Sequence, residues 1–576
     1  MTVPVFLEPH QQFRKFRFCG SKAWCSVGRL SHMFSEVWMS APFADWTPPD
    51  HPGTFEIGLV LAGATSAGCY TAGVVDYLIE ALEKFEHSKA NPGGPQHNVR
   101  IRVIAGASAG GITAAGLLAS LAGAKLVPPV KTILYDSWVQ RIDFKELLRT
   151  TDLTGKGIPR SLLHGETVAE ILDDAFEVQP HPLPPYVAEP LDVVITLTNL
   201  RGVPYRFQTV PSDVTSNFEL MSMHSDYVRF AMRSHANTTV APDAVVLNPA
   251  KIGKADSKWA YLRQISLATA ASPLALAPQR VFTRRQDYIS REWPMPSSNA
   301  PSYTSFVKIN PEATVSNDYE IVATDGGAMN NEPLELGRLA LAGRGMRNAR
   351  SPKIARRAMI LIDPIPGFET EYDPNDDLLG VARSLIFAWW WQARFNPEEL
   401  ALAYDEDVYS RFIISPSRSD GAKPAIFSSA LSSFAGFLSA RFREHDYELG
   451  RRNCQYFLQE HFLLSKDNRL FANWAADPAY IRRAKYKDTP IELLPIIPLP
   501  LDEPSIKLPD RPQVATAVKF DLVENLVERR MDALAAKASS KLPLMPWIAA
   551  KVGWTLYKGK IKNLIMSKIR NELDNL

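Results

Sequence analysis

The chain has 576 residues, of which 46% are hydrophobic, and 64 basic against 62 acidic residues leave a formal net charge of +2. The length allows one large domain with additions, or two to three domains, and the composition is that of a globular protein with a substantial core. A chain without an overall basic field is not expected to be a dedicated nucleic-acid binder. The four cysteines show neither a C-x-x-C pair nor metal-ligand spacing, which predicts free thiols in a reducing compartment.

Residues 1–54 precede the first predicted strand. They contain Trp24, Trp38 and Trp46 and end in a proline-rich stretch, and this composition predicts a lead segment that packs on the core. The first eight residues lack a charged segment followed by an apolar one, so they do not resemble a signal peptide. Residues 103–124 form the longest uncharged run, and their Gly, Ala and Ser content predicts a buried helix rather than a membrane span.

A turn of small residues follows the first predicted strand, 56–61, and precedes a predicted helix, 70–85. Its members are Gly63, Ala64, Thr65, Ser66, Ala67 and Gly68. Such a turn at a helix N-terminus points free N–H groups at an anion. The spacing is not that of a dinucleotide-binding loop and no P-loop lysine follows, so an oxyanion hole is the better interpretation.

The residues from Gly106 to Gly110 match the G-x-S-x-G pattern of a nucleophile elbow. An alternating stretch, 99–104, predicts a strand before them, and an Ala- and Leu-rich stretch, 111–124, predicts a helix after them. Gly106 and Gly110 let the start of the helix pack tightly under the bend. We therefore predict Ser108 as a nucleophile, and the N–H of Ala109 as a further part of the oxyanion hole.

Residues 321–327 are a short β-branched run that ends in Asp325, Gly326 and Gly327. One interpretation is a plain turn, because Asp-Gly is a common turn dipeptide. The other is an acid at a strand end, with two glycines that let backbone and substrate approach. Ser108 is a weak nucleophile until a base takes its proton, and Asp325 is predicted to be that base.

Strands at 191–197, 358–362 and 412–414 continue the pattern, with helices between and after them. Strands that alternate with helices from residue 56 onward predict an α/β fold, with a largely parallel sheet and helices on both faces. Asp363 ends one of these strands and is either a turn starter or an acid near the site.

The order of glycine turn, G-x-S-x-G and D-G-G resembles the patatin-like phospholipases, and large bacterial members in particular. Residues 270–278 are similar to the small-residue and proline segment that precedes the acid, residues 325–333 to the acid loop, and residues 449–455 to a helix of large bacterial members. The resemblance covers about residues 55–465. It implies a three-layer α/β/α fold and a Ser–Asp dyad that cleaves lipid or phospholipid esters, with neither a metal nor an organic cofactor.

The predicted oxyanion turn departs from the family pattern G-G-G-x-[K/R]-G. Ala67 replaces the basic residue, and Ala64 and Thr65 replace two glycines. The backbone N–H groups remain, but the positive field is lost and positive φ angles become harder to adopt. This departure leaves open a second hypothesis, a catalytically weak patatin fold that serves as a membrane- or partner-binding module.

A third hypothesis is an esterase with a Ser–His–acid triad, whose histidine would follow the acid in the chain. His445 and His461 satisfy this order. The charged neighbours of His445 predict a surface position, and the helical pattern around His461 predicts a structural histidine. None of the 11 histidines has metal-ligand spacing.

The sequence divides into four predicted parts. They are an N-terminal lead, 1–54; an acyl hydrolase domain, 55–489; a Pro-rich linker, 490–516; and a helical C-terminal extension, 517–576.

In the C-terminal extension, Trp547, Trp554, Tyr557 and Ile561 recur at helical spacing, with lysines at many of the other positions. This pattern is typical of a basic amphipathic helix at a membrane surface. The alternative is a helix that docks its apolar stripe on the core. We expect a cytoplasmic protein with peripheral contact to the inner face of a membrane through residues 547–571.

Overall fold

The computed structural model describes residues 51, 53–124, 132–208, 218–295, 305–343, 348–365, 377–394, 397–574 and 576. The predicted N-terminal lead, with two of the four cysteines, lies almost wholly outside these residues.

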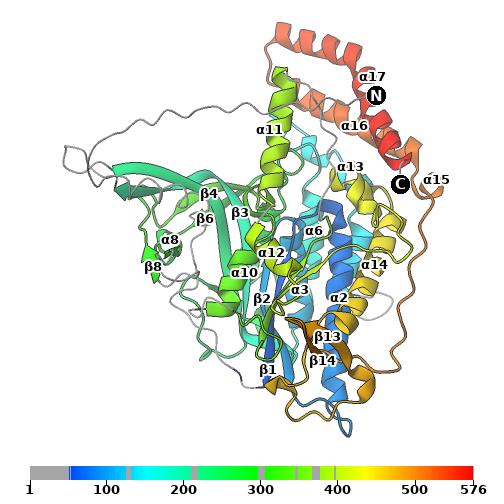
Figure 1. Ribbon diagram of the computed structural model, residues 1–576. Helices are drawn as coiled ribbons and strands as arrows, with labels where there is room; N and C mark the ends of the chain where they lie inside the picture. The colour runs from blue at the N-terminus through cyan, green and yellow to red at the C-terminus, as the bar shows by residue number, and fades with distance from the viewer. Residues whose placement is uncertain are drawn as a thin grey trace, which may run out of the picture. The chain divides into compact units, whose positions relative to one another are not determined.

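A nine-stranded, mostly parallel sheet forms the core, with the strand order β11-β10-β1-β2-β3-β4-β5 (Figure 1). Its parallel part consists of β11 (Arg411–Ile414), β10 (Arg357–Ile362), β1 (Thr54–Leu61), β2 (Asn98–Gly106) and the first part of β3 (Val187–Gln208). Two strands pair antiparallel with β3, and each has a further neighbour: β4 (Phe218–Met232) with β5 (Val245–Leu247), and β9 (Tyr319–Asp325) with β6 (Gln279–Thr283). Every residue of β1 is buried, as expected for a central strand covered on both faces.

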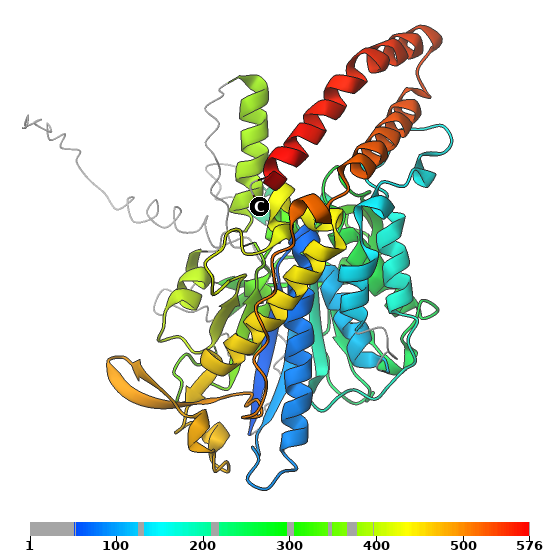
Figure 2. The same ribbon diagram turned by 90° about the vertical axis from the view of Figure 1, so that its right-hand side faces the viewer.

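Helices cover both faces of the sheet, which confirms the predicted α/β fold. On one face, α10 (Leu334–Ala342) contacts β1, β2 and β10. On the other face lie α3 (Ala109–Ala122) and α7 (Ser257–Thr269). Outside α3, the long helices α2 (Gly68–Ser88) and α14 (Ala440–Glu460) lie along each other (Figure 2).

Shorter elements complete the described structure. The helices are α4 (Ile133–Tyr135), α5 (Phe144–Leu147), α6 (Glu166–Ala175), α8 (Arg285–Ile289), α9 (Gly327–Asn330), α11 (Leu378–Gln392), α12 (Pro397–Tyr404), α13 (Ala430–Ser433) and α15 (Val514–Ala517). Two small sheets consist of β7 (Glu292–Met295) with β8 (Ser305–Lys308), and of β12 (Leu463–Ser465), β14 (Thr489–Pro495) and β13 (Arg482–Tyr486).

The predicted Pro-rich linker, 490–516, begins in a sheet. Strand β14 pairs with β12 and β13, and Ile496, Ile497 and Leu499 are buried after it. Because these apolar residues between the prolines pack into the core, the extended connection starts only after residue 499. Part of it is held on α14, where the side chain of Gln455 binds the backbone of Pro504 and Ile506.

The C-terminal extension forms two helices, α16 (Phe520–Ser539) and α17 (Leu544–Asp574). Lysines of α17 face acids of α16, as in the ion pairs of Lys558 with Glu528 at 2.7 Å and of Lys562 with Glu524 at 2.9 Å.

The apolar side chains of α17 have two different environments. Met566, Ile569 and Leu573, near its end, are buried, as the docking alternative predicts. Val552 and Leu556, in its first half, are exposed. The side chain of Trp547 lies outside the described residues. Among the described helices, none combines the length and the apolar content that crossing a membrane requires.

Candidate active site

Ser108 lies on a strained turn between β2 and α3. Its backbone has φ 51° and ψ −124°, a conformation that a residue with a side chain rarely adopts. The two glycines of the motif make the bend sterically feasible. A Cβ on Gly110 would lie 2.0 Å from the carbonyl oxygen of Leu61, and one on Gly106 would lie 2.7 Å from the carbonyl oxygen of Gly110. The turn is therefore packed so closely that neither position accepts a side chain.

Asp325 lies at the end of β9, where the antiparallel pairing places it opposite Leu197 of β3. The hydroxyl of Ser108 donates a hydrogen bond to its Oδ2 at 3.0 Å. Its Oδ1 accepts the backbone N–H of Gly327 at 2.8 Å. Gly326 brings the chain against Thr196, whose carbonyl oxygen would lie 2.3 Å from an added Cβ. The fold thus brings together two residues that are 217 positions apart.

Burial controls the protonation of Asp325, which is 4% exposed. Removal from water disfavours the charged carboxylate and raises the pKa of Asp325 to about 6, although the hydrogen bonds from Gly327 and Ser108 partly oppose this shift. At neutral pH the carboxylate is still mostly ionised, and it is a stronger base than an ordinary aspartate.

The predicted oxyanion turn runs alongside Ser108. Gly63 has no room for a side chain, because a Cβ there would lie 2.8 Å from the Cβ of Ser108. Three of the six predicted N–H groups already have acceptors. Gly63 donates to the carbonyl of Asn331, Ala67 to that of Ala64, and Gly68 to those of Ser66 and Thr65. The N–H groups of Ala64, Thr65 and Ser66 are therefore the candidates within the turn, together with that of Ala109 at the start of α3.

The oxyanion turn is held by a segment more than 360 positions later in the chain. The hydroxyl of Ser66 donates to the carbonyl of Ser433 at 2.6 Å and accepts the N–H of Gly436 at 3.1 Å. Within the turn, Thr65 has φ 48°, so a non-glycine residue adopts the left-handed conformation that the glycine-rich family pattern would provide. Contacts from elsewhere in the fold stabilise this conformation.

A cavity of about 50 Å³ lies above Ser108 and is largely apolar. Its walls include Thr65, Ile112, Trp138, Leu163, Leu276 and Phe437. Sites for small organic ligands usually have volumes of roughly 300–1,000 Å³. The lining suits an acyl chain, but in this conformation the walls must move before such a chain can enter.

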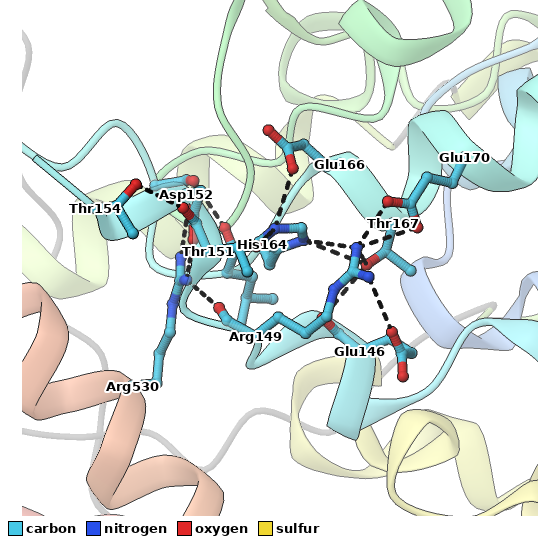
Figure 3. Close-up of polar contacts among 12 residues, drawn as sticks. Glu146, Arg149, Thr151, Asp152, Thr154, His164, Glu166, Thr167, Glu170 and Arg530 are labelled. Carbon is cyan, nitrogen blue, oxygen red and sulfur yellow. Dashed lines mark hydrogen bonds and ion pairs between the residues drawn. The ribbon is translucent and has the colours of Figure 1, made fainter.

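Arg530 of α16 holds the segment next to Leu163 of the cavity wall, and Figure 3 shows its contact with Asp152. The Arg530 side chain is buried and binds Asp152, with Nη2 and Oδ2 2.9 Å apart. Its Nε donates to the carbonyl of Leu162 at 2.8 Å, next to Leu163 of the cavity wall. A buried guanidinium with several acceptors fixes a segment firmly, because each of those acceptors would otherwise be left unpaired.

Another part of the cavity wall is attached to α17. The N–H of Leu431 donates to the carboxylate of Glu572 at 2.7 Å, three residues before Phe434, which faces the cavity. Both helices of the C-terminal extension thus hold segments that line the cavity.

Next to the oxyanion turn lies a charged cluster of the buried Asp363 with the partly buried Glu332 and Arg394. Arg394 donates to Asp363 at 3.0 Å and lies 3.5 Å from Glu332. Burial and the charge of Asp363 raise the pKa of Glu332, while Arg394 opposes the shift. The Asp363 carboxylate accepts the N–H of Ile365 at 3.0 Å, as the turn-starter interpretation predicts, and it also binds Arg394.

Neither histidine of the triad hypothesis has the predicted environment. His445 is buried, not at the surface, and its two ring nitrogens contact Arg418 at 2.7 Å and Asp446 at 2.8 Å. Helix α14 turns this face inward, so the charged neighbours in the sequence were misleading. His461 is exposed at the end of α14. The hydroxyl of Ser108 binds Asp325 instead.

Two supporting residues were not singled out from the sequence. Thr269 accepts the N–H of Ser108 through its hydroxyl at 2.8 Å, and Asn331 donates to the carbonyl of Gly63 at 3.2 Å. Thr269 directly precedes residues 270–278 and Asn331 lies within residues 325–333. Both could have been chosen as candidates because these segments carry the family resemblance. Arg394 lies far from these segments in the sequence, and no motif indicated that it is near the site.

A serine on a strained strand-to-helix turn, bound to a buried acid at the edge of a mostly parallel sheet, is the arrangement of an α/β serine hydrolase. A family model described as patatin-like phospholipase matches residues 59–337. The chain belongs to the patatin-like phospholipase family, and this membership supports a lipid acyl hydrolase activity in general terms.

A relative of the chain is an uncharacterised protein, y4iI, of Sinorhizobium fredii. The two are 32% identical over 549 residues, which cover 84% of this chain and 76% of the relative. Among solved structures, the crystal structure of VipD from Legionella pneumophila aligns with 70% of this chain and 67% of its own. The identity is 11% and the TM-score 0.25, a likeness too distant to inform the site.

Proposed function

We propose that the protein is a serine acyl hydrolase of the phospholipase or lysophospholipase type, which cleaves fatty-acyl esters with a dyad of Ser108 and Asp325. The observation that carries the proposal is the 3.0 Å hydrogen bond from the Ser108 hydroxyl to the buried Asp325 carboxylate. The strained backbone of Ser108 supports it, because such strain is concentrated at functional sites.

In the proposed reaction, the Oγ of Ser108 attacks the acyl carbonyl carbon, and Asp325 accepts the proton that Oγ gives up. Negative charge develops on the carbonyl oxygen and is stabilised by the N–H groups of Ala64, Thr65, Ser66 and Ala109. The intermediate collapses, and the departing alcohol takes the proton from Asp325. Asp325 then deprotonates a water molecule, whose oxygen bonds to the carbonyl carbon of the acyl-enzyme. As this second intermediate collapses, the bond to Ser108 Oγ breaks, Asp325 returns the proton to Oγ, and the fatty acid leaves.

The proposed substrate is a lipid or phospholipid, since the cavity beside Ser108 is largely apolar. Peripheral membrane contact through residues 547–571 is part of the same proposal. It is supported by Val552 and Leu556, which expose apolar surface on the first half of α17. The ion pairs of Lys558 and Lys562 with α16 already neutralise part of the charge that the sequence suggested for lipid binding.

The decisive experiment compares the wild type with Ser108→Ala. We expect the wild type to hydrolyse a p-nitrophenyl ester and to be labelled covalently by a fluorophosphonate, and the folded variant to do neither. A folded wild type that is neither labelled nor active would favour the binding-module hypothesis, to which the 50 Å³ cavity also lends support.

A further inference from the structure

Helix α11 is an apolar helix that leaves most of its described surface uncovered. Its fifteen residues, LLGVARSLIFAWWWQ, contain one charged residue, Arg383. The exposed fractions are 85% for Leu378, 52% for Val381, 67% for Leu385 and 49% for Trp389. Their spacing of three or four residues places them on one face of the helix. An exposed stripe of this kind marks a surface that binds a partner or a membrane.

The helix is well formed at both ends. At its start, the Asp377 carboxylate accepts the N–H of Gly380 at 2.7 Å, which caps the first turn. After its end, Arg394 donates to Asp363 and to the carbonyl of Ile365, at 3.0 and 2.7 Å. The apolar stripe therefore belongs to a capped helix that is anchored after its last turn.

The anchored end of α11 lies at the edge of the sheet that carries Ser108. Asp363 directly follows β10, and the last residues of β10 pair with the last residues of β1. The carbonyl of Leu61, at the end of β1, accepts the N–H of Ala107, next to Ser108. Helix α11 also contacts α9, which follows Asp325. Figures 1 and 2 show α11 extending away from this edge of the sheet.

The sequence of α11 changes along its length in the way that a lipid bilayer changes with depth. Leu378, Val381 and Leu385 occupy the first half of the helix, away from the anchor at Arg394, and Trp389 lies close to that anchor. Tryptophan is enriched at the level of the lipid headgroups, and aliphatic side chains in the hydrocarbon. Fifteen residues extend about 22 Å, too short for a hydrocarbon core of about 30 Å but sufficient to enter one leaflet.

One lysine of α17 and one in the turn between α16 and α17 favour a lipid surface over a protein partner. Lys541 and Lys560 have no carboxylate within ion-pair distance among the described residues, and Lys560 lies beside the exposed Tyr557 and Ile561. Unpaired cations next to exposed apolar side chains complement an anionic lipid headgroup layer.

We infer that α11 inserts into one leaflet of an anionic phospholipid membrane and thereby places the bilayer at the mouth of the Ser108 site. The choice of lipid as the occupant rests on the proposed function. The two can be tested apart, because membrane insertion is measurable in a protein that lacks the nucleophile.

The experiment uses full-length Ser108→Ala protein with Cys19 and Cys25 replaced by serine, since Cys69 and Cys454 are buried. An environment-sensitive fluorophore is attached to Leu385→Cys or, as a matched control, to Ile354→Cys. Ile354 is also exposed but precedes β10, at the opposite edge of the sheet. Vesicles of phosphatidylcholine and phosphatidylglycerol should shift the emission to the blue at position 385 and leave position 354 unchanged. No shift at 385, or equal shifts at both positions, would overturn the inference.

A second variant, Leu378→Asn with Val381→Asn and Leu385→Asn, guards against a labelling artefact. These side chains are exposed, so the melting temperature should not change, while binding to the same vesicles should weaken at least tenfold. Ile354→Asn should bind as well as the parent protein. If light scattering instead shows a dimer that the triple variant dissociates, a second copy of the chain covers α11 and the inference is wrong. Fluorophosphonate labelling of the wild type tests the proposed function independently.

Discussion

Two turns meet at Ser108, and they are held in different ways. The nucleophile turn is shaped mainly by its own glycines and by the neighbouring strand β1, against whose last residue Gly110 packs, with one distant hydrogen bond from the N–H of Ser108 to the hydroxyl of Thr269. The oxyanion turn, residues 63–68, is shaped by Asn331, Ser433 and Gly436, which are 268, 367 and 370 positions from their partners.

The two turns accommodate the same unfavourable backbone conformation in different ways. Both turns contain a non-glycine residue with positive φ, Ser108 at 51° and Thr65 at 48°. Such a conformation costs about 1–2 kcal/mol for a residue with a side chain. Around Ser108, flanking glycines relieve the crowding. Around Thr65, where Ala64 replaces a glycine of the family pattern, distant hydrogen bonds offset the cost.

The largest effect is expected at Asp325, the acid that accepts the hydroxyl of Ser108. Asp325→Asn keeps the shape but removes the acceptor for the serine proton, so hydrolysis of a p-nitrophenyl ester should fall by about 10²–10⁴-fold. His445→Ala serves as the control for the triad hypothesis. If activity survived in Asp325→Asn and disappeared in a folded His445→Ala, the dyad would be wrong.

The nucleophile turn should not tolerate a single added methyl group. In Gly110→Ala the Cβ would meet the backbone of Leu61, which cannot move aside as a side chain could. We expect the free energy of unfolding to fall by about 3 kcal/mol, together with loss of activity. Gly553→Ala in α17 is the matched control, because nothing lies within 4 Å of its added Cβ. Chemical denaturation should show equal or higher stability for that control.

The raised pKa of Asp325 predicts opposite effects of pH on activity and on stability. Activity should rise with pH through about 6, where the carboxylate becomes available as a base. Stability should fall between pH 4 and pH 7, because the folded protein holds this proton more tightly than the unfolded chain. Asp325→Asn should therefore be as stable as the wild type at pH 4. At pH 8 its free energy of unfolding should be higher than that of the wild type by on the order of 2 kcal/mol. Equal melting of both proteins at pH 8 would contradict the raised pKa.

The smallest effect is expected at the oxyanion turn. Ser66→Ala leaves the carbonyl of Ser433 and the N–H of Gly436 without their partner. We expect a loss of about 1–3 kcal/mol of stability, and a decrease in kcat with little change in KM, because the turn would act only on the developing charge. Ser120→Ala, which removes only a bond to the preceding turn of α3, should change neither. An unaltered kcat in Ser66→Ala would mean that local sequence alone shapes this turn.

Much of the candidate site was predictable from the sequence. The elbow around Ser108, the acid at Asp325 and the α/β fold rest on short patterns, in which glycine spacing and strand periodicity restrict the backbone within a few residues. The predicted pairing of Ser108 with Asp325 came from chemistry, since a serine nucleophile requires a base.

Other features depend on residues far apart in the sequence. Local sequence did not reveal that residues 433–436 hold the oxyanion turn, that His445 is buried, or that β14 occupies the start of the predicted linker. It also did not distinguish α11, an exposed apolar helix, from a buried one, because both have the same composition. The sequence by itself determined the nucleophile turn, its acid and the fold class, since steric limits on the backbone act between near neighbours. Only the tertiary structure decided which surfaces are covered, since burial depends on what the rest of the chain places against them.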